Sequence, residues 1–316
     1  MPTGLFGHPI SRELENWFLK HGGQHDDAEW KAFIQDFKSC LDGKVLELLS
    51  EHDNEGRFGM SKAGGCTRSQ ALKKLGFDAE PFTGSTHFTF LLGHIVEVAS
   101  MAALRRVGYA VTGAQEPVRI EPFMSSYSDG IIEGVEGTKG RPAILSVKST
   151  GYKKSGKQGK GWVRRGFPEL PFEGVRKAQP GWYAQVQAEM HGSGLKFAFI
   201  QVTAKDIIKA MEGDPYLGDK GNGSLTFYGQ LVAYNPRFVE QHLLPVWDAQ
   251  WEAVQSGKPG NAYFLHNERD EYVKLSPGAT DWQPNAGATG TYNPCNYCDL
   301  IGACRSQLAT RFHTQS

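Results

Sequence analysis

The pattern of hydrophobic and polar positions changes along the chain from helical to strand-like spacing and back. Spacing of three and four residues predicts helices in the first 60 residues and over about 86–107, ending at Gly108. Short apolar segments bounded by turn residues predict strands, in chain order YAVTG, PVRIEP, SYSDGIIEG, PAILSVKST, LKFAFIQV and LTFYGQLVAY. A further helix, GWYAQVQAEMHG, separates the fourth of these strands from the fifth. A helix, several strands, a helix and a strand in this order predict an α/β core.

The remaining segments divide the chain into three regions. We expect a helical N-terminal region over 1–60, a core over 61–256 and a loop-rich C-terminal segment over 257–316. Within the core, Ser61 is a candidate cap for a short helix that ends at Gly76, and Asn235-Pro236 is placed to open another helix. The stretch from Gly151 to about Pro180 is rich in glycine and lysine and is expected to be a long loop.

Composition narrows the classes of protein to consider. The 316 residues are enough to bury a core without disulfides, and 34 Lys and Arg balance 34 Asp and Glu. Zero net charge argues against a uniformly basic coat for nucleic acid and leaves a local basic patch open. No apolar run approaches the ~20 residues of a membrane span, and the N-terminus lacks a signal-peptide pattern. We therefore expect a cytoplasmic protein without a membrane partner, and the absence of GxGxxG and GxxxxGK[ST] motifs argues against Rossmann and P-loop units.

Three of the five cysteines form a compact cluster, Cys295-x2-Cys298-x5-Cys304, with spacing suited to chelation. A tetrahedral zinc ion or a cubane iron–sulfur cluster needs a fourth soft ligand. Cys66 is the candidate, because it follows Gly64-Gly65 and precedes a predicted helix whose N-terminus favours a thiolate. The alternative is two pairs of unrelated buried cysteines that bind no metal. Cys40 is not part of the proposed ligand set, and we interpret it as an ordinary buried thiol.

The two cysteine segments, CTRSQALKKLGF and CNYCDLIGAC, resemble those of the iron–sulfur nucleases in the RecB-like PD-(D/E)xK superfamily. That group includes the CRISPR adaptation exonucleases and the nuclease domain of AddB. The resemblance covers about residues 61–305 and implies a restriction-endonuclease-like core, with a central mixed sheet flanked by helices. It also implies a 4Fe–4S cluster that joins the two ends of the domain through Cys66, Cys295, Cys298 and Cys304.

The resemblance further implies hydrolysis of phosphodiester bonds with Mg²⁺ or Mn²⁺, which carboxylates and backbone carbonyls bind. Asp129, in a strand that opens with Asp-Gly, resembles the catalytic Asp of the family. Lys148 matches the lysine of the Glu-x-Lys half-motif, and Val147 takes the place of the residue whose carbonyl contributes to the ion. A lysine at this place orients water or stabilises developing charge.

The chain departs from the half-motif at Ser146, where the family has Glu. Three explanations stay open: a carboxylate from elsewhere, a disabled site, or a relative that only binds DNA. Glu189 is one replacement, because it lies four residues after Gln185 on one face of a helix that resembles the Gln-rich helix of the lambda-exonuclease and YqaJ branch. Glu97 is the other, since it lies on an apolar helix face where an unpaired carboxylate is costly. The alternative interpretations are structural. The helix that contains Glu189 would then be an ordinary amphipathic helix with polar residues on one side. Glu97 would form a salt bridge to Arg105 or Arg106, although both are poorly phased for it on the helix.

Residues 137–168 carry nine positive charges and no Asp or Glu, a marked asymmetry in a neutral chain. We expect this stretch to bind DNA, either single-stranded or at the end of a duplex, unless it is only a solvated disordered loop. The candidate DNA-binding residues are Lys153, Lys154, Lys157, Lys160, Arg164 and Arg165.

The sequence thus predicts a metal-dependent DNA exonuclease of phage or bacterial recombination, repair or DNA processing. A catalytically inactive DNA-binding relative is the first alternative, on account of Ser146. A zinc-stapled interaction protein without a role on nucleic acid is the second. Self-association into a homo-oligomer, or binding to a recombination or adaptation protein, is left open.

Overall fold

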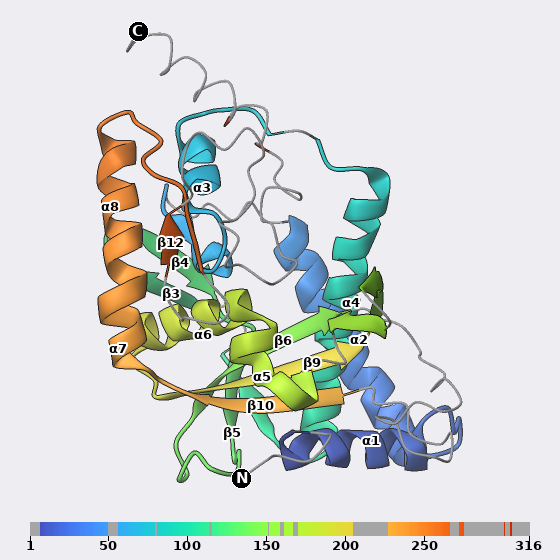
Figure 1. Cartoon of the computed structure of the whole chain (residues 1–316). Coiled ribbons are helices and arrows are strands. Elements are labelled where there is room, and N and C mark those ends of the chain that lie inside the picture. The colour runs from blue at the N-terminus through green and yellow to red at the C-terminus, as the bar shows by residue number, and fades with distance from the viewer. Residues whose placement is uncertain are drawn as a thin grey trace, which may run out of the picture.

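A five-stranded mixed sheet forms the centre of the molecule in the computed structural model (Figure 1). The structure describes residues 7–49, 56–79, 81–113, 116–150, 152–158, 161–166, 170–204, 227–265, 272–274, 300 and 304. The strand order is β10-β9-β6-β5-β2, and the strands are β2 (Ala110–Thr112), β5 (Gly130–Glu133), β6 (Ala143–Thr150), β9 (Phe197–Ala204) and β10 (Phe227–Ala233). Only β6 and β9 run parallel; the other neighbours are antiparallel.

Two helices fit this topology as the sequence pattern predicts. Helix α4 (Gly84–Arg106) precedes β2, and α6 (Pro180–Ser193) lies between β6 and β9. A parallel pair needs such a crossover, because two parallel strands cannot be joined by a tight turn. The predicted order of a helix, several strands, a helix and a strand is confirmed, and with it the predicted α/β fold class with a central mixed sheet flanked by helices.

The sheet has a hydrophobic core on each face. Leu145 and Val147 of β6 pack with buried residues of α4, whereas Ile144 belongs to the core that contains α6. Side chains alternate between the two faces of a strand. Ser146 and Lys148 therefore lie on the face covered by α6.

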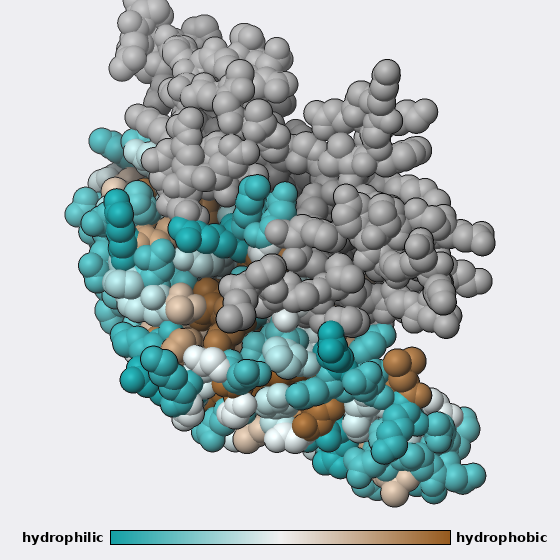
Figure 2. All heavy atoms as spheres, turned by 60° about the horizontal axis from the view of Figure 1, so that its bottom comes forward, coloured by the Kyte–Doolittle hydropathy of each residue, from teal (hydrophilic) through white to brown (hydrophobic). Residues whose placement is uncertain are grey.

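The N-terminal helices α1 (Pro9–His21) and α2 (Ala28–Leu49) complete the α4 side of the core. Leu14, Trp17 and Phe33 are buried there with residues of α4 and the sheet, and α1 lies along β10 (Figure 1). Hydrophilic side chains dominate the described surface in Figure 2, where the hydrophobic residues form small separate groups. The N-terminal helices are thus amphipathic and share one core with the sheet.

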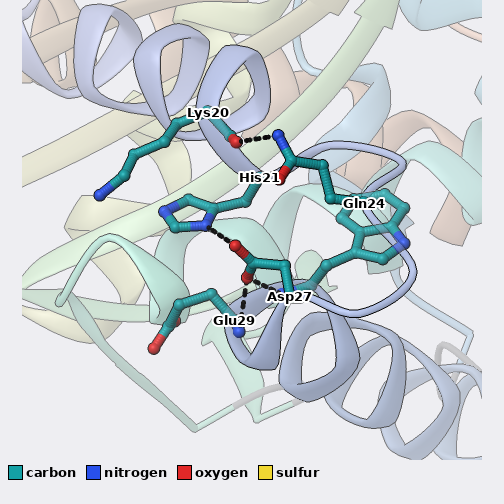
Figure 3. Close-up of polar contacts among 6 residues, drawn as sticks. Lys20, His21, Gln24, Asp27 and Glu29 are labelled. Atoms are coloured by element: carbon teal, nitrogen blue, oxygen red, sulfur yellow. Dashed lines mark hydrogen bonds and ion pairs between the residues drawn. The ribbon is translucent and has the colours of Figure 1, made fainter.

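The turn between α1 and α2 is fixed by Asp27 (Figure 3). One carboxylate oxygen of Asp27 accepts hydrogen bonds from the backbone N–H groups of Glu29 and Trp30, at 2.8 and 3.0 Å. This is the bonding of a helix N-cap. The other oxygen lies 2.8 Å from His21 Nδ1, and this hydrogen bond is the main cause that lowers the pKa of Asp27.

Smaller elements surround this core. A second sheet has the order β1-β4-β3 and consists of β1 (Phe58–Gly59), β3 (Pro117–Ile120) and β4 (Met124–Tyr127). The remaining elements are the 3-10 turn η1 (Met60–Lys62), α3 (Thr67–Lys74), β7 (Tyr152–Gln158), β8 (Gly161–Gly166), α5 (Leu170–Ala178), α7 (Pro236–Phe238), the π-helical turn η3 (Val239–Leu243), α8 (Leu244–Gln255), β11 (Tyr263–Leu265) and β12 (Tyr272–Lys274).

Three local predictions were wrong. The stretch from Gly151 to Pro180 is not one long loop, because β7 and β8 pair as an antiparallel hairpin and α5 follows. Ser61 does not cap the next helix, since it lies in η1 and the cap residue is Cys66. The segment SYSDGIIEG forms two strands in different sheets, β4 and β5, with Asp129 between them.

Helix α4 also corrects an expectation about apolar runs. Of the described helices, α4 alone is long and apolar enough, by length and composition, to cross a membrane, and 33% of its most apolar window is buried. A core helix passes the same test, so one such helix is weak evidence for a span. Its second half is buried in the core, whereas Phe88, Phe90 and Leu91 in its first half are exposed.

Candidate active site

The side chain of Asp129 is fixed against the middle of β6 by a hydrogen bond from the backbone of that strand. Its Oδ2 atom accepts from the N–H of Val147 at 2.7 Å. The antiparallel register of β5 and β6 places Gly130, the residue after Asp129, opposite Leu145. The carboxylate is therefore positioned beside the Ser146-Val147-Lys148 segment, as the half-motif predicts.

Glu189 approaches the same segment from α6. The Glu189 side chain is 2% exposed, and its Oε1 accepts hydrogen bonds from Gln185 Nε2 at 2.9 Å and from Ser126 Oγ at 3.0 Å. The contact with Gln185 confirms that the two residues share a helix face. Two donors on one oxygen fix the direction in which the carboxylate points.

The electrostatics show that three charged groups meet here. The pKa of Glu189 is raised to about 7, chiefly by burial and to a smaller degree by the nearby negative charge of Asp129. The positive charge of Lys148 is the main opposing influence, followed by the hydrogen bonds from Gln185 and Ser126. The negative charge of Asp129 disfavours ionisation of the buried Glu189 carboxyl, so a cation bound beside both carboxylates would stabilise the site.

Two serine hydroxyls beside these groups have no hydrogen-bond partner among the described residues. Ser146 and Ser128 are each 1% exposed, and their Oγ atoms are buried without a donor or acceptor. A buried hydroxyl left unsatisfied costs about 1–3 kcal/mol, so such a group calls for a bound water, ion or ligand. Ser146 stands where the family has Glu, and Ser128 immediately precedes Asp129.

Glu97 lies in α4, the helix on the opposite face of the sheet from α6. Its Oε1 lies 3.0 Å from Lys44 Nζ of α2, and its Oε2 lies 3.5 Å from Nδ1 of His94. The structure thus pairs Glu97 with Lys44, and neither Arg105 nor Arg106 forms the salt bridge considered as an alternative. Those two arginines bind Cys40 Sγ and Asp36 instead, at 3.1 and 2.8 Å.

The described residues contain no group of three or more His, Cys, Asp or Glu side chains that could hold a metal ion. The oxygens at the site come from two carboxylates, the orphaned hydroxyl of Ser146 and the backbone of Val147. Mg²⁺ usually binds through one or two carboxylates and keeps several waters, so this donor set suits Mg²⁺ or Mn²⁺.

The cysteine constellation is only partly described. Cys66 is the N-cap of α3 and is half-buried, as is Cys304, whereas Cys295 and Cys298 lie outside the described residues. A side chain at Gly64 would lie 2.4 Å from the Cα atom of Gly181, so the backbone before Cys66 closely approaches α6. The close approach expected from Gly64-Gly65 is confirmed for Gly64.

One buried cation follows Cys66 in the first turn of α3. Arg68 is 3% exposed, and its Nη1 donates to the carbonyl of Gly260 at 2.6 Å. Its Nε and Nη2 atoms are buried without a hydrogen-bond partner. An anionic group near this helix terminus would satisfy them.

Some functional contacts were not foreseen from the sequence. Ser126, Ser128 and Lys44 contact or flank the acidic residues, and no motif singled them out. Ser126 lies in the short strand β4 and Ser128 follows it, directly before Asp129, where buried hydroxyls signal a polar site. The sequence around Lys44 does not indicate its ion pair, because its partner Glu97 is far away in the chain.

The structure thus places Asp129 beside the Ser146-Val147-Lys148 segment, with Glu189 of α6 close to both Asp129 and Lys148. No protein-family model matches the chain, and no curated protein matches its sequence.

Several solved structures resemble the chain. One of them is LHK-Exo, an alkaline exonuclease from Laribacter hongkongensis, in complex with dAMP. It matches at a TM-score of 0.40 and 11% identity, over 64% of this chain and 89% of that one. SSO0001 matches at a TM-score of 0.40 and 13% identity, over 88% and 98% of the two chains. A phage-related exonuclease from Haemophilus somnus 129PT matches at a TM-score of 0.37 and 17% identity, over 61% and 79%. Likeness at this level carries no conclusion on activity, so function depends on the geometry of the site.

Proposed function

We propose that the protein is a metal-dependent DNA nuclease that acts as an exonuclease in the cytoplasm, with its active site at Asp129, Lys148 and Glu189. The observation that carries this proposal is the convergence of the two carboxylates and the lysine around the orphaned hydroxyl of Ser146. A purely structural ion pair gives no reason for an unsatisfied hydroxyl beside it, whereas a bound hydrated ion would supply that hydroxyl with a partner.

Glu189 replaces the missing carboxylate of the half-motif in this proposal. Ser146 and Lys148 face α6, and Glu189 is the acidic residue of α6 that interacts with both Asp129 and Lys148. The serine leaves room that a Glu at 146 would fill. Glu97 is kept as a candidate ligand from α4, although its ion pair with Lys44 already compensates its charge.

Asp129, Glu189 and the Val147 carbonyl would hold Mg²⁺ or Mn²⁺. When bound, such an ion activates water and neutralises charge that develops on the phosphate. Lys148 contributes a fixed positive charge that orients the attacking water or stabilises the same developing charge. Gln185 and Ser126 fix the Glu189 carboxylate, so that it loses little orientational freedom when it binds.

We also propose that Cys66, Cys295, Cys298 and Cys304 hold a 4Fe–4S cluster. The residues that are described fit this role: Cys66 lies at a helix N-terminus, where a thiolate is stabilised, and the next turn carries N–H groups of Arg68 that no described residue satisfies. The cluster would fasten the C-terminal segment to α3. The N–H groups of Arg68 would then offset its negative charge.

A catalytically inactive DNA-binding relative is the second candidate. The observation in its favour is the pKa of Glu189 at about 7, which leaves this carboxyl partly protonated at neutral pH and weakens an ion site. Digestion of end-labelled single- and double-stranded DNA with Mn²⁺ distinguishes the two. Cleavage by the wild type and its loss in Asp129→Ala would support the nuclease, whereas binding of DNA without cleavage would support the inactive relative.

A further inference from the structure

A cavity lined by charged and aromatic side chains lies where β10 leads into α7, beside the C-terminal end of α6 (Figure 1). Its volume of about 600 Å³ falls in the range of small-molecule sites. The lining residues belong to α6, to the turn before β9, to the β10–α7 turn and to η3. They are Met190, His191, Lys196, Tyr234, Pro236 and Glu240.

The cavity lies on the far side of α6 from the candidate active site. His191 follows Glu189 by two residues, which is ~200° around an α-helix at ~100° per residue. Accordingly, Glu189 accepts a hydrogen bond from Ser126 of β4, whereas Nδ1 of His191 lies 2.8 Å from the hydroxyl of Tyr234, the residue after β10. A ligand in the cavity would therefore not contact the proposed catalytic groups.

Tyr234 is held in a fixed position by its surroundings. Gln187 of α6 is fully buried, and its Nε2 donates to the carbonyl of Ala233 at 2.9 Å while its Oε1 accepts from the N–H of Asn235 at 2.8 Å. The N–H of Tyr234 itself donates to the carbonyl of Lys196 at 2.9 Å. The backbone on both sides of Tyr234 is thus fixed, so little ordering cost is left for the binding of a ligand.

Lys196 and Glu240 bring opposite charges to the cavity without pairing with each other. Nζ of Lys196 lies 4.8 Å from the centroid of the Tyr234 ring, a cation–π distance. Burial raises the pKa of Tyr234, and the negative charge of Glu240 adds to the increase, so this carboxylate is also near the ring. Neither charged group has an ion-pair partner among the described residues. A ligand with an anionic group and a hydrogen-bond donor would satisfy both.

His191 adds a second donor beside Lys196. The phenol of Tyr234 keeps its proton at neutral pH and can donate it to Nδ1 of His191. The hydrogen bond at one ring nitrogen sets the role of the other, so Nε2 then carries the ring proton. Nε2 makes no hydrogen bond with the residues that the structure describes, which leaves it for a ligand. An ammonium group and an imidazole N–H together suit a phosphate.

Glu240 and the uncharged part of the lining suit a nucleobase. Glu240 belongs to η3, and π-helical turns are rare and frequently occur at functional sites. A carboxylate accepts a hydrogen bond from an exocyclic amino group such as N4 of cytosine, whereas O4 of thymine is an acceptor. The Tyr234 ring, Met190 and Pro236 provide aromatic and apolar surface on which a base can pack.

We propose that this cavity binds a nucleoside monophosphate, with its phosphate at Lys196 and His191 and the amino group of its base at Glu240. The inference does not depend on the proposed function, because no metal ion and no catalytic residue takes part. A free mononucleotide and a nucleotide within a DNA strand offer the same chemistry, and the experiments below distinguish these two sources.

A series of ligands tests the proposal on the wild type. In calorimetric titrations in EDTA, dCMP should bind with one site per chain. Deoxycytidine, inorganic phosphate and dTMP should each bind at least ~10-fold more weakly, because each lacks one hydrogen bond to a charged group. Absence of dCMP binding, equal affinity for all four, or equally tight binding of a zwitterion such as glutamine would overturn the proposal.

Single variants with matched controls assign the two ends of the ligand. Lys196→Gln should weaken dCMP binding at least ~10-fold and remove the preference for dCMP over deoxycytidine. Glu240→Gln should remove the preference for dCMP over dTMP. Lys177→Gln and Glu173→Gln, an exposed pair on α5, make the same changes away from the cavity and should leave the Kd unchanged. Preferences that survive in the cavity variants, or are lost in the controls as well, would overturn the proposal.

Two further titrations locate the nucleotide and identify its source. Asp129→Ala should bind dCMP as tightly as the wild type, and a loss of binding would place the nucleotide at the proposed ion site and reject the cavity. A 5′-phosphorylated oligodeoxycytidine is then compared between the wild type and Lys196→Gln. An equal loss for the oligomer and for dCMP identifies a nucleotide of a DNA strand, and a loss for dCMP alone identifies a free mononucleotide.

Discussion

The Oδ2 atom of Asp129 lies 2.7 Å from the backbone nitrogen of Val147, the residue between Ser146 and Lys148. This bond joins the two half-motifs of the site directly, although Asp129 lies between β4 and β5 and Val147 lies in β6. It also means that the Asp129 side chain has two separable features, a hydrogen-bond acceptor for β6 and a negative charge for the proposed ion.

Substitution of Asp129 separates these two features. Asp129→Asn retains an acceptor for the Val147 N–H and removes the charge, whereas Asp129→Ala removes both. We expect both variants to lose Mn²⁺-dependent cleavage by on the order of 10²-fold or more, because the ion loses a charged ligand. Only the Ala variant should also lose about 1–2 kcal/mol of unfolding free energy, from the unsatisfied N–H. Cleavage that survives in Asp129→Asn would contradict a role as metal ligand.

The pKa of Glu189 predicts how stability depends on pH without metal. The folded protein holds this pKa at about 7, above the ordinary 4.5, so the folded state retains a proton that the unfolded state has released. Stability should therefore fall as the pH rises from 4.5 to about 7, by roughly 3 kcal/mol in total. Denaturant unfolding of the wild type and Glu189→Gln at several pH values measures the difference. In the Gln variant, the free energy of unfolding should lack this part of its pH dependence. Parallel curves of unfolding free energy against pH for the two proteins would show that the Glu189 carboxyl does not have a raised pKa in the folded state.

Divalent ions should reverse this trend. An ion binds the ionised carboxylate, so Mn²⁺ should raise the melting temperature of the wild type more at pH 8 than at pH 6. Glu189→Gln should show little stabilisation by Mn²⁺ at either pH. Equal stabilisation of both proteins would place the ion elsewhere.

Exchange of the carboxylate between positions 189 and 146 tests whether Glu189 has replaced the family's Glu. Glu189→Gln should abolish cleavage, and Ser146→Glu in the same background should restore part of it, because the charge returns to β6 on the same face of the sheet. Ser146→Gln in that background is the matched control, since it adds the bulk without the charge. Failure of the Glu variant to exceed the Gln variant in cleavage, with both proteins folded, would favour the disabled interpretation.

The sequence predicted the parts of this site that depend on local spacing. Gln185 and Glu189 meet because they are one helical turn apart, and Ser146 and Lys148 share a face because they are two residues apart on a strand. The i,i+4 relation therefore predicted the contact between Gln185 and Glu189, whereas the part of these residues in an active site stays a prediction.

Contacts between distant segments were not accessible in this way. Lys44 pairs with Glu97 only because α2 packs against α4, which local periodicity does not encode. The β7–β8 hairpin was predicted as a loop because its sequence lacks the apolar alternation that indicates a strand. The antiparallel pairing of the two strands could therefore not be predicted from a hydrophobic pattern.

The Lys44–Glu97 ion pair gives a prediction that decides between two roles of Glu97. Their side chains are 7% and 12% exposed, so removing one charge from the pair should cost on the order of 3 kcal/mol. We expect Lys44→Met and Glu97→Gln to lower stability in denaturant unfolding and to leave stabilisation by Mn²⁺ intact. If Glu97→Gln abolishes that stabilisation while Lys44→Met does not, Glu97 is a ligand of the ion rather than a structural partner.

The proposed cluster makes the last prediction, and its control is another cysteine of the same chain. Anaerobically purified wild type should be brown, with about four iron atoms per chain. Cys66→Ser should lose the colour and the iron, whereas Cys40→Ser should keep them, because Cys40 is half-buried and accepts a hydrogen bond from Arg105. Since Cys66 caps α3 beside the close approach of Gly64 to Gly181, loss of the cluster should also release the C-terminal segment from the core. Limited proteolysis after residue 257 should accordingly be faster in Cys66→Ser and in Cys298→Ala than in Cys40→Ser. Stoichiometric zinc without iron in anaerobic protein would replace the cluster by a structural zinc site, and equal proteolysis of all variants would remove the fastening role.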